Sequence, residues 1–372
     1  MYKRTFRRLI RKVYYIIGEV FLRVVSCFFI WLRFRKFKPA MAKRILLIKI
    51  ERIGDLVLST PGIRAVKEKF PYSEISIVVN SYTKPIIEKF PYIDEIFEYN
   101  KKMRLAEKIK VIRMLRLRDF YLAIDLTTRD FFFTPVWLSF FSKAKLRIGL
   151  DNFGRGFLYN IKVAPYRYPC YYPQEIIHIL CPLGIVVSNL QPQIFVSDRD
   201  RDWIREYLSS KITSSPDIIV VIHPGGYYKQ QWWRKEGYAR LGRCLAEEYN
   251  AVIFFVGDHR ERVLIDEIIN LISSKESKNK RLINTAGRLT LGQLMALISK
   301  SCLFIGNSSG PLHIAVGLKI PTVSFLSPNV SERWRPQGEN NLCFSLYNSN
   351  VDEVISAVKA QLTKIQFNEE RN

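Results

Sequence analysis

The residues of most chemical interest lie between positions 302 and 317, where an apolar run meets small residues, a proline and a histidine. The run 302–305 is typical of a buried strand, and the small side chains of 306–310 would let a ligand approach the backbone closely. Pro311 suits the first turn of a helix, because a proline there loses only an N–H group that would lack a helical partner anyway. Such a helix start attracts phosphate through its N–H groups and its dipole, with His313 in the first turn.

The same stretch has a simpler interpretation. Asn307 or Ser309 could serve only to cap the helix of an ordinary α/β turn, as short polar residues often do. The local pattern alone leaves both interpretations open.

A second candidate follows the first apolar run of the chain, in the sequence Arg52-Ile53-Gly54-Asp55. Gly54 would let the backbone turn closely, and Asp55 would project from the carboxyl end of a strand. A carboxylate in that position can act as a general base that takes a proton from an attacking hydroxyl. The alternative is that Asp55 only caps the helix that follows.

Two more loops follow expected strands in the second half of the chain. The sequence His223-Pro224-Gly225-Gly226 permits close approach of a ligand, and Lys229 beyond it could meet a phosphate as a point charge. Trp232 and Trp233 could stack on a ring or belong to the core. The run 257–261 contains acids that could bind a ribose hydroxyl, or that could simply cap a helix.

Several chemistries fit the sequence poorly. No G-x-G-x-x-G follows the first strand and no G-x-x-x-x-G-K-[ST] occurs, which disfavours nicotinamide dehydrogenases and P-loop NTPases. The six cysteines are widely spaced, without a C-x-x-C pair or a histidine at zinc-ligand spacing. We expect reduced, mostly buried thiols and no metal site.

Strand-like runs alternate with helix-like ones along residues 43–365, which is typical of parallel sheets covered on both faces. Two such α/β domains would bind ligands at the carboxyl ends of their strands. Residues 165–173 are predicted to be loop, and 192–200 to mark the domain boundary. Strands are expected at 44–50, 75–80, 94–98, 121–126, 145–150, 217–222, 251–256, 281–284, 302–305 and 320–326, and helices at 56–70, 83–90, 101–118, 236–249, 260–272, 291–299 and 351–365.

The net charge of +24 over 372 residues predicts an anionic partner, such as nucleic acid, a membrane surface or a phosphorylated substrate. Residues 1–44 hold thirteen Lys and Arg against the single acid Glu19, so half of the excess lies in this extension. A second basic block, 101–118, has eight Lys and Arg against Glu107 alone.

Residues 13–32 are strongly apolar and about as long as the ~20 residues that span a bilayer. On a helix, Glu19 and Arg23 share one narrow face, and basic clusters flank both ends. We therefore expect a helix that lies in the cytoplasmic membrane interface, with a single spanning helix as the alternative. A signal peptide is disfavoured, because 30–37 offers no small-residue cleavage site.

Taken together, these motifs resemble glycosyltransferase family 9, the heptosyltransferase family of lipopolysaccharide core assembly. The resemblance covers about Lys43 to Pro328 and depends on the order of four motifs, which are Arg52 to Asp55, His223 to Gly225, Gly257 to Glu261 and Ser308 to His313. It implies the GT-B architecture, an α/β fold of two Rossmann-like domains facing a central cleft, here preceded by an amphipathic or hydrophobic N-terminal helix. The expected parts are a basic membrane-associating extension at 1–42, an acceptor-binding domain at 43–195, a nucleotide-sugar-binding domain at 196–345, and a C-terminal helix and tail at 346–372.

The resemblance also implies an inverting transfer without metal or other cofactor, from a nucleotide-diphosphate sugar such as ADP-heptose to an anionic lipid-linked glycan. Asp55 matches the catalytic base of the family. The expected donor-binding residues are His223, Gly225, Lys229, Glu261, Ser308, Ser309, Gly310 and His313, among which Gly310 and His313 meet the diphosphate, Ser309 takes the family's Ser/Thr position and Glu261 contacts the nucleoside. Lys101, Lys102 and Arg104 match basic residues that face the anionic acceptor, and no nucleic-acid partner is expected.

Two positions depart from the family pattern. Ser308 stands where the family has an aspartate, and Gln231 stands where it has a lysine if Trp233 is the family tryptophan. These departures leave open the identity of the donor sugar. They also motivate one alternative, a non-catalytic membrane-bound nucleotide-sugar binder. A second alternative is a GT-B nucleotide-sugar 2-epimerase, which needs no lipid acceptor. For the glycosyltransferase we expect a location at the cytoplasmic face of the inner membrane, either peripheral or anchored by a single helix.

Overall fold

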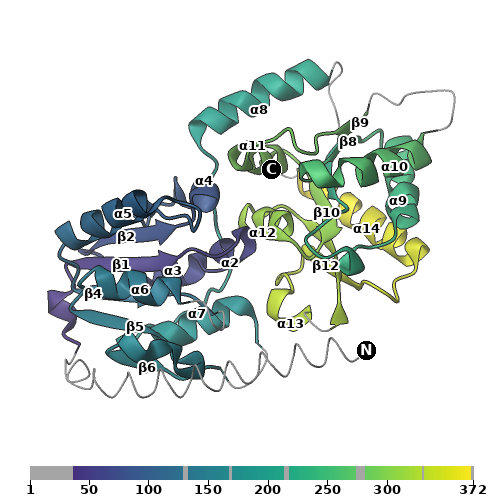
Figure 1. Ribbon diagram of the computed structural model, residues 1–372. Helices are drawn as coiled ribbons and strands as arrows, with labels where there is room; N and C mark the ends of the chain where they lie inside the picture. Colours follow the sequence, from purple (N-terminus) through teal and green to yellow (C-terminus); the bar gives the residue numbers. More distant parts are fainter. Residues whose placement is uncertain are drawn as a thin grey trace, which may run out of the picture. The chain divides into compact units, whose positions relative to one another are not determined.

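The computed structural model describes residues 37–128, 133–166, 170–212, 218–273, 281–328 and 331–369 (Figure 1). The expected membrane-associating helix at 13–32 lies outside these ranges and stays a prediction. Within them the chain forms two compact units. The first comprises the described residues up to Arg52, Ser59–Lys84 and Pro91–Leu190, and the second comprises Ile53–Leu58, Pro85–Phe90 and the chain from Gln191 onward.

A six-stranded parallel sheet forms the centre of the first unit. Its strand order, β3-β2-β1-β4-β5-β6, is that of a doubly wound α/β fold. The central strand β1 is buried on both faces, with Ile45 paired to Ile75 of β2 and Leu122 of β4. The strands are β1 (Arg44–Lys49), β2 (Glu74–Val79), β3 (Glu95–Glu98), β4 (Leu122–Asp125), β5 (Leu146–Leu150) and β6 (Ile161–Val163).

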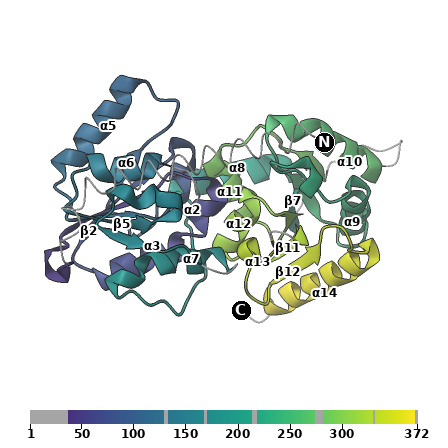
Figure 2. The same ribbon diagram turned by 60° about the horizontal axis from the view of Figure 1, so that its bottom comes forward.

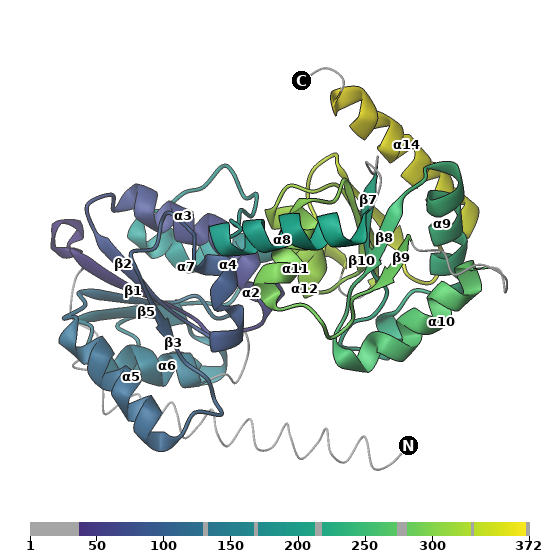
Figure 3. The same ribbon diagram turned by 90° about the horizontal axis from the view of Figure 1, so that it is seen from above.

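Helices cover both faces of this sheet, as Figure 3 shows. On one face Leu115 and Leu138, from α5 and α6, pack in a cluster with Leu46 and Ile48 of β1. On the other face α3 and α7 approach so closely that a Cβ on Gly62 would lie 2.5 Å from Ile176. The helices and 3-10 turns are η2 (Pro39–Met41), α3 (Thr60–Lys69), η3 (Ser81–Thr83), α5 (Leu105–Leu117), α6 (Thr134–Phe141), η4 (Asn152–Leu158), α7 (Tyr172–Leu180) and η5 (Cys181–Leu183). The short helix α4 (Lys84–Ile87) follows η3 and belongs to the second unit from Pro85 onward.

The second unit repeats this arrangement with a parallel sheet of order β12-β11-β10-β7-β8-β9. Its core includes Ile222, Phe255 and Ile305 from three neighbouring strands, and Trp233 stacks on Phe325 with ring centroids 3.9 Å apart. The strands are β7 (Ile219–His223), β8 (Val252–Phe255), β9 (Leu282–Asn284), β10 (Leu303–Asn307), β11 (Thr322–Leu326) and β12 (Asn341–Ser345). The carboxyl ends of β7 and β10 lie side by side, which brings His223 next to Gly306.

The helices of the second unit include a short one, α2, from a distant part of the sequence. Gly317 of α12 contacts it closely, since a Cβ there would lie 3.1 Å from Val57 and from Ile194. The helices and 3-10 turns are α2 (Ile53–Val57), α8 (Asp198–Lys211), η6 (Lys229–Gln231), α9 (Lys235–Glu248), η7 (His259–Glu261), α10 (Arg262–Ile272), α11 (Leu291–Ser299), α12 (Gly310–Gly317), α13 (Ser331–Trp334) and α14 (Val351–Glu369).

The structure corrects several expected elements. The helix expected at 56–70 is interrupted between α2 and α3, because Pro61 has no N–H to continue the helical hydrogen bonds. The loop expected at 165–173 gives way to α7 at Tyr172, and α8 begins at Asp198 within the expected boundary segment. Two other strands, β6 and β12, two other α-helices, α6 and α13, and the 3-10 turns were not expected.

The two compact units divide between Leu190 and Gln191, and α14 belongs to the second unit. The functional limits 43–195 and 196–345 stay predictions. Of the helices that the structure describes, none is long and apolar enough to cross a bilayer.

Candidate functional site

The segment that carries Asp55 packs against the helix that carries His313. A Cβ on Gly54 of α2 would lie 2.8 Å from Cδ2 of His313, and one on Gly310 would lie 3.0 Å from Ile53. Only glycine therefore allows α2 and α12 to approach this closely. Asp55 and His313 are both buried, with 4% and 3% of their surfaces exposed. Two residues that the sequence singled out separately thus lie in one compact unit.

His313 is neutral over most of the physiological pH range. Burial lowers the pKa of its imidazole to about 4, although the nearby carboxylate of Asp55 acts in the opposite direction. Its Nδ1 atom is buried and has no hydrogen-bond partner in the part of the chain that the structure describes. A buried, unpartnered nitrogen is costly unless a ligand satisfies it, so His313 is suited to contact a bound group.

The start of α12 has no side-chain cap. Ser309 occupies the N-cap position with an extended backbone, but its hydroxyl makes no cap hydrogen bond. It lies instead 2.9 Å from Nδ1 of His223. Asn307 does not cap the helix either, because its Oδ1 accepts from the backbone N–H of Trp233 at 3.0 Å. The capping interpretation of this stretch is therefore wrong, and the helix start keeps its capacity to bind an anion.

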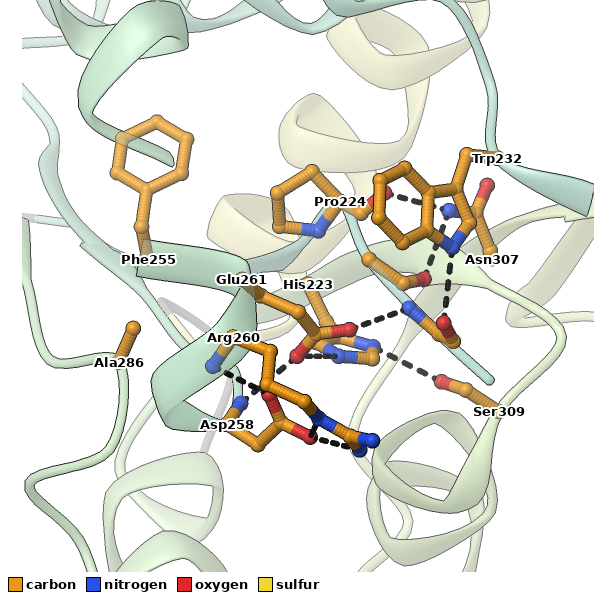
Figure 4. A network of polar contacts seen from close by, with 12 residues as sticks. His223, Pro224, Trp232, Phe255, Asp258, Arg260, Glu261, Ala286, Asn307 and Ser309 are labelled. Atoms are coloured by element: carbon orange, nitrogen blue, oxygen red, sulfur yellow. Dashed lines mark hydrogen bonds and ion pairs between the residues drawn. The ribbon is translucent and has the colours of Figure 1, made fainter. Parts of the chain in front are cut away.

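Three side chains link the ends of neighbouring strands beside this helix start (Figure 4). His223, at the end of β7, contacts Ser309 through Nδ1 and lies 3.4 Å from Oε2 of Glu261 through Nε2. Glu261 also accepts backbone hydrogen bonds from Gly226 at 2.5 Å and from Asp258 at 2.7 Å. The chain Glu261–His223–Ser309 thus connects η7, the loop after β7 and the start of α12.

Glu261 is ionised in this setting. Burial by itself would raise its pKa, but the hydrogen bond and charge of His223 and the amides of Asp258 and Gly226 outweigh burial and lower the pKa. A Cβ on Gly225 would lie 2.0 Å from Oε1 of Glu261, so the position requires glycine. Since both oxygens of Glu261 accept hydrogen bonds from the protein, its role in the structure is to position the loop. Its expected contact with a nucleoside stays a prediction.

Asn307 was not expected among the site residues, yet it fixes the loop after β7. Its Nδ2 donates to the carbonyls of Pro224 at 2.7 Å and Gly225 at 3.0 Å. Its Oδ1 accepts from the hydroxyl of Tyr238 at 3.1 Å as well as from Trp233. The sequence signal for Asn307 was a polar residue at the end of an apolar strand. That signal is ambiguous, because a residue that caps the following helix gives the same pattern.

The exposed Lys229 lies near the same loop. Its ammonium sits 5.8 Å from the ring centroid of Trp232, whose Nε1 donates to the carbonyl of Gly226 at 3.0 Å. Trp233 is a core residue, as its stacking on Phe325 shows. Ser308 is half-buried at the junction of β10 and α12, where its amide donates to the Phe325 carbonyl at 3.3 Å.

The expected acceptor residues Lys101, Lys102 and Arg104 lie in the first unit. All three are exposed in the loop between β3 and α5, and the backbone N–H of Arg104 donates to Glu107 at 2.7 Å. These basic residues thus belong to one loop of the first unit, whereas the donor-site candidates belong to the second unit.

Sequence reasoning missed two buried ionic groups in the first unit. Lys49 pairs with Glu51 and donates to the Tyr172 hydroxyl at 2.6 Å, directly before the segment that carries Asp55. At the end of β4, Asp125 pairs with Arg155 and accepts from Tyr159.

Burial and the Asp125 charge raise the pKa of the Tyr159 hydroxyl well above its ordinary value. These groups could not be found from the sequence, because α7 and η4, which supply the partners, were not expected. Within the described ranges, no three His, Cys, Asp or Glu side chains converge to hold a metal ion.

Solved structures that match this chain over most of its length show the class of fold to which it belongs. The glycosyl transferase family 9 protein from Veillonella parvula DSM 2008 matches with a TM-score of 0.78 and 20% identity, over 89% of this chain and 99% of that one. Escherichia coli ADP-heptose lipopolysaccharide heptosyltransferase II matches with a TM-score of 0.74 and 20% identity, over 87% and 99%. The fold is that of a GT-B glycosyltransferase.

A family model identifies the family within this class. The description glycosyltransferase family 9 (heptosyltransferase) matches residues 108–361, and the protein belongs to this family of glycosyltransferases. Lipopolysaccharide heptosyltransferase 3 of Escherichia coli is 26% identical over 300 residues, which cover 78% of this chain and 85% of the relative. The predicted fold class and family are confirmed.

Proposed function

We propose that this protein is an inverting, metal-independent glycosyltransferase that transfers a sugar, heptose from ADP-heptose, to an anionic lipid-linked glycan such as the lipopolysaccharide inner core. One observation carries the proposal. Asp55 lies in the same compact unit as His313, on a helix that packs against the uncapped start of α12. A carboxylate base and an anion-binding helix start therefore meet, as a sugar transfer from a diphosphate requires.

The reaction follows from the roles of these groups. The carboxylate of Asp55 accepts the proton of an acceptor hydroxyl, and the hydroxyl oxygen attacks the anomeric carbon of the donor sugar. The bond from that carbon to the diphosphate oxygen breaks with inversion, and its electron pair leaves with the nucleoside diphosphate. The N–H groups at the start of α12 and the open nitrogen of His313 stabilise the charge that develops on the diphosphate.

The chain Glu261–His223–Ser309 positions the donor and takes no part in the proton transfer to Asp55. Glu261 holds the His223 ring through Nε2, and His223 holds the Ser309 hydroxyl through Nδ1. Gly225 and Lys229 then border the diphosphate, the first through close backbone approach and the second through its charge. Ser308 cannot supply the charged partner that an aspartate would give a sugar hydroxyl, so it bears on which sugar is accepted.

The remaining partners follow from charge. The exposed bases Lys101, Lys102 and Arg104 attract the anionic acceptor, and the basic extension 1–42 holds the protein at the cytoplasmic face of the inner membrane. Two relatives from Escherichia coli are named lipopolysaccharide heptosyltransferase 3, and these names support an acceptor of the lipopolysaccharide class.

The first test of this proposal is donor binding, measured by calorimetry with ADP-heptose against UDP- and GDP-sugars. We expect ADP-heptose to bind best. If none of the three binds, the proposed function is wrong. Turnover of ADP-heptose in the absence of acceptor would identify an epimerase instead, and binding without turnover over a panel of lipid-linked glycans would identify a non-catalytic binder.

The second test concerns the base. The substitution Asp55→Asn should lower turnover about 10²- to 10⁴-fold while donor affinity stays the same, because the amide cannot accept the proton. Asp352→Asn is the matched control, since Asp352 also lies in the first turn of a helix in the second unit and is exposed. Equal turnover of the Asp55 variant and the control would refute the base role.

A further inference from the structure

Helix α5 of the first unit is unusual in how little of it is buried. Of its 13 residues, Leu115 alone is buried, while Val111 and Ile112 pack partly against the core. Leu105 and Leu117 are 74% and 79% exposed. A single exposed leucine is common on protein surfaces. Two leucines exposed to this extent on one short helix indicate that the helix surface binds a partner.

The exposed leucines belong to a row that runs along the outer side of α5. Leu105, Ile109, Arg113 and Leu117 are spaced four residues apart and so lie on neighbouring turns. Leu115 points to the opposite side, into the core. Figure 2 shows one end of α5 extending beyond the rest of the first unit.

The same helix carries a positive charge that the protein does not neutralise. Lys108, Lys110 and Arg113 form no ion pair within the described part of the chain, and the one acid of the helix, Glu107, is used to cap its first turn.

Helix α8 offers the contrast expected of an ordinary solvated helix, because each of its three arginines pairs with a neighbouring aspartate. These pairs are Arg199–Asp200, Arg201–Asp198 and Arg205–Asp202. The unbalanced charge of α5 is therefore not a general property of the helices of this protein.

An aromatic group on α6 continues this surface. Trp137 is 42% exposed and stacks on Phe141 with ring centroids 5.7 Å apart. Arg116 of α5 joins the two helices, since its Nε donates to the Phe141 carbonyl at 2.9 Å and its guanidinium lies 6.0 Å from the Phe141 ring centroid. We call the surface formed by Leu105, Ile109, Lys110, Arg113, Leu117 and Trp137 the α5–α6 face.

We propose that the α5–α6 face binds the surface of an anionic lipid bilayer. Lysine and arginine are attracted to anionic headgroups, whereas exposed leucine and tryptophan side chains are stabilised at the boundary between headgroups and acyl chains. The α5–α6 face combines both kinds of residue and contains no acid that would neutralise its charge. Its basic residues therefore match the anionic headgroups, and its apolar residues match the boundary with the acyl chains. This contact is additional to the expected role of residues 1–42, and it does not depend on the donor or the acceptor glycan.

The contact can be mapped by lysine footprinting of the full chain with an amine-reactive acetylating reagent, read by mass spectrometry. The probes are vesicles of phosphatidylglycerol and phosphatidylcholine, vesicles of phosphatidylcholine alone, and an RNA oligonucleotide. We expect the anionic vesicles to slow acetylation of Lys110 at least fivefold in the bound protein. Lys69 is the internal control, because it is exposed on α3, which covers the opposite face of the same sheet (Figure 3).

Every other outcome of the footprint overturns the proposal. Acetylation of Lys110 at an unchanged rate in vesicle-bound protein would show that a different segment makes the contact. The same holds if the full chain does not bind the anionic vesicles. Protection of Lys110 by RNA but not by vesicles would assign the face to nucleic acid instead.

Variants give a quantitative check by vesicle co-sedimentation. One basic residue near an anionic membrane strengthens binding about fivefold, so Lys110→Gln with Arg113→Gln should weaken it about 25-fold. Leu105→Ser with Leu117→Ser should weaken it about tenfold or more. The control Lys69→Gln with Lys319→Gln removes the same charge from exposed positions elsewhere.

An equal loss in the control and the charge variant would overturn the proposal. Donor binding and turnover on a soluble, deacylated acceptor should remain unchanged in the variants. A failure of the proposed function would therefore appear in those assays, whereas a failure of the membrane contact would appear only with vesicles.

Discussion

Burial of the His313 imidazole makes the stability of the second unit depend on pH. Its pKa is lowered to about 4 in the folded protein, whereas an unfolded histidine titrates near 6.5. The unfolded chain therefore binds the proton more tightly. The stabilising contribution is fully present above pH 6.5 and is lost as the pH falls from 6.5 to about 4.

We therefore expect His313→Gln to remove part of this pH dependence, because glutamine does not titrate. Between pH 7.5 and pH 5, the unmodified protein should lose about 2 kcal/mol of unfolding free energy more than the variant. Urea unfolding at the two pH values measures this difference, and the other histidines cancel because both proteins contain them. Equal losses in the two proteins would show that His313 is not buried in its neutral form.

At the scale of single residues, the sequence indicated the positions but not their partners. Asp55, Gly310 and His313 were identified from motifs and lie close to one another in the structure. Glu261 was identified too, yet its buried pairing with His223 depends on the meeting of two loops after neighbouring strands. No local pattern reveals that contact, since the partners are far apart in the sequence.

The side chain of Asn307, at the end of β10, holds the loop that follows β7, and that link can be tested. Asn307→Asp should lower the unfolding free energy by about 2–4 kcal/mol, because a carboxylate cannot donate to the Pro224 and Gly225 carbonyls. Asn350→Asp is the matched control. Asn350 is exposed, and its Oδ1 accepts from the Asp352 amide at 3.1 Å, which an aspartate would do equally well.

Denaturant unfolding of the two asparagine variants gives the comparison. The control should differ from the unmodified protein by less than about 0.5 kcal/mol. If Asn307→Asp and Asn350→Asp have the same unfolding free energy, the hydrogen bonds of Asn307 contribute nothing to stability.

At the scale of elements, most strands and several helices were predicted, whereas the strands β6 and β12 and the helices α6, α7, α8 and α13 were not. Helix α11 was expected at 291–299 and is found there. Helix α6 was missed because its sequence, TPVWLSFF, is too short and too uniformly apolar to show a helical period. Strand β12 was missed because it is half-buried along its length at the edge of the sheet, and its apolar run, Leu342 to Phe344, is only three residues long.

Each unit has its own core, so a defect in one should leave the other intact. Removing one partner of a buried ion pair costs about 3–5 kcal/mol, and Arg155 of the first unit pairs with Asp125 where both are fully buried. Arg155→Met should therefore lower the unfolding free energy of the first unit by about this amount. Hydrogen exchange in increasing denaturant, read at β1 and at β10, follows the two units separately.

We expect the loss at β1 and little change at β10. Lys145→Met is the control, because Lys145 forms an exposed pair with Asp119 in the same unit and should contribute less than about 1 kcal/mol. Equal losses at β1 and β10 would show that the two units unfold together.

For the whole molecule, the alternation of strands and helices predicted two parallel α/β units, and both were found. It could not predict that residues 53–58 and 85–90 belong to the second unit, although the residues before and after them in sequence belong to the first. Their location is determined by packing against residues far along the chain. In α2, for example, Val57 lies beside Gly317, a contact that no periodic pattern contains.

The location of α2 has a consequence for dissecting this enzyme into fragments. A cut between Leu190 and Gln191 appears natural, but the C-terminal fragment would lack the peptide that covers Gly317 and that supplies Asp55. The N-terminal fragment would carry that peptide with no partner for it. Neither fragment is complete by itself, so we expect activity only when the two fragments are mixed. In the mixture, the five-residue helix α2 of the N-terminal fragment would have to pack into the C-terminal fragment.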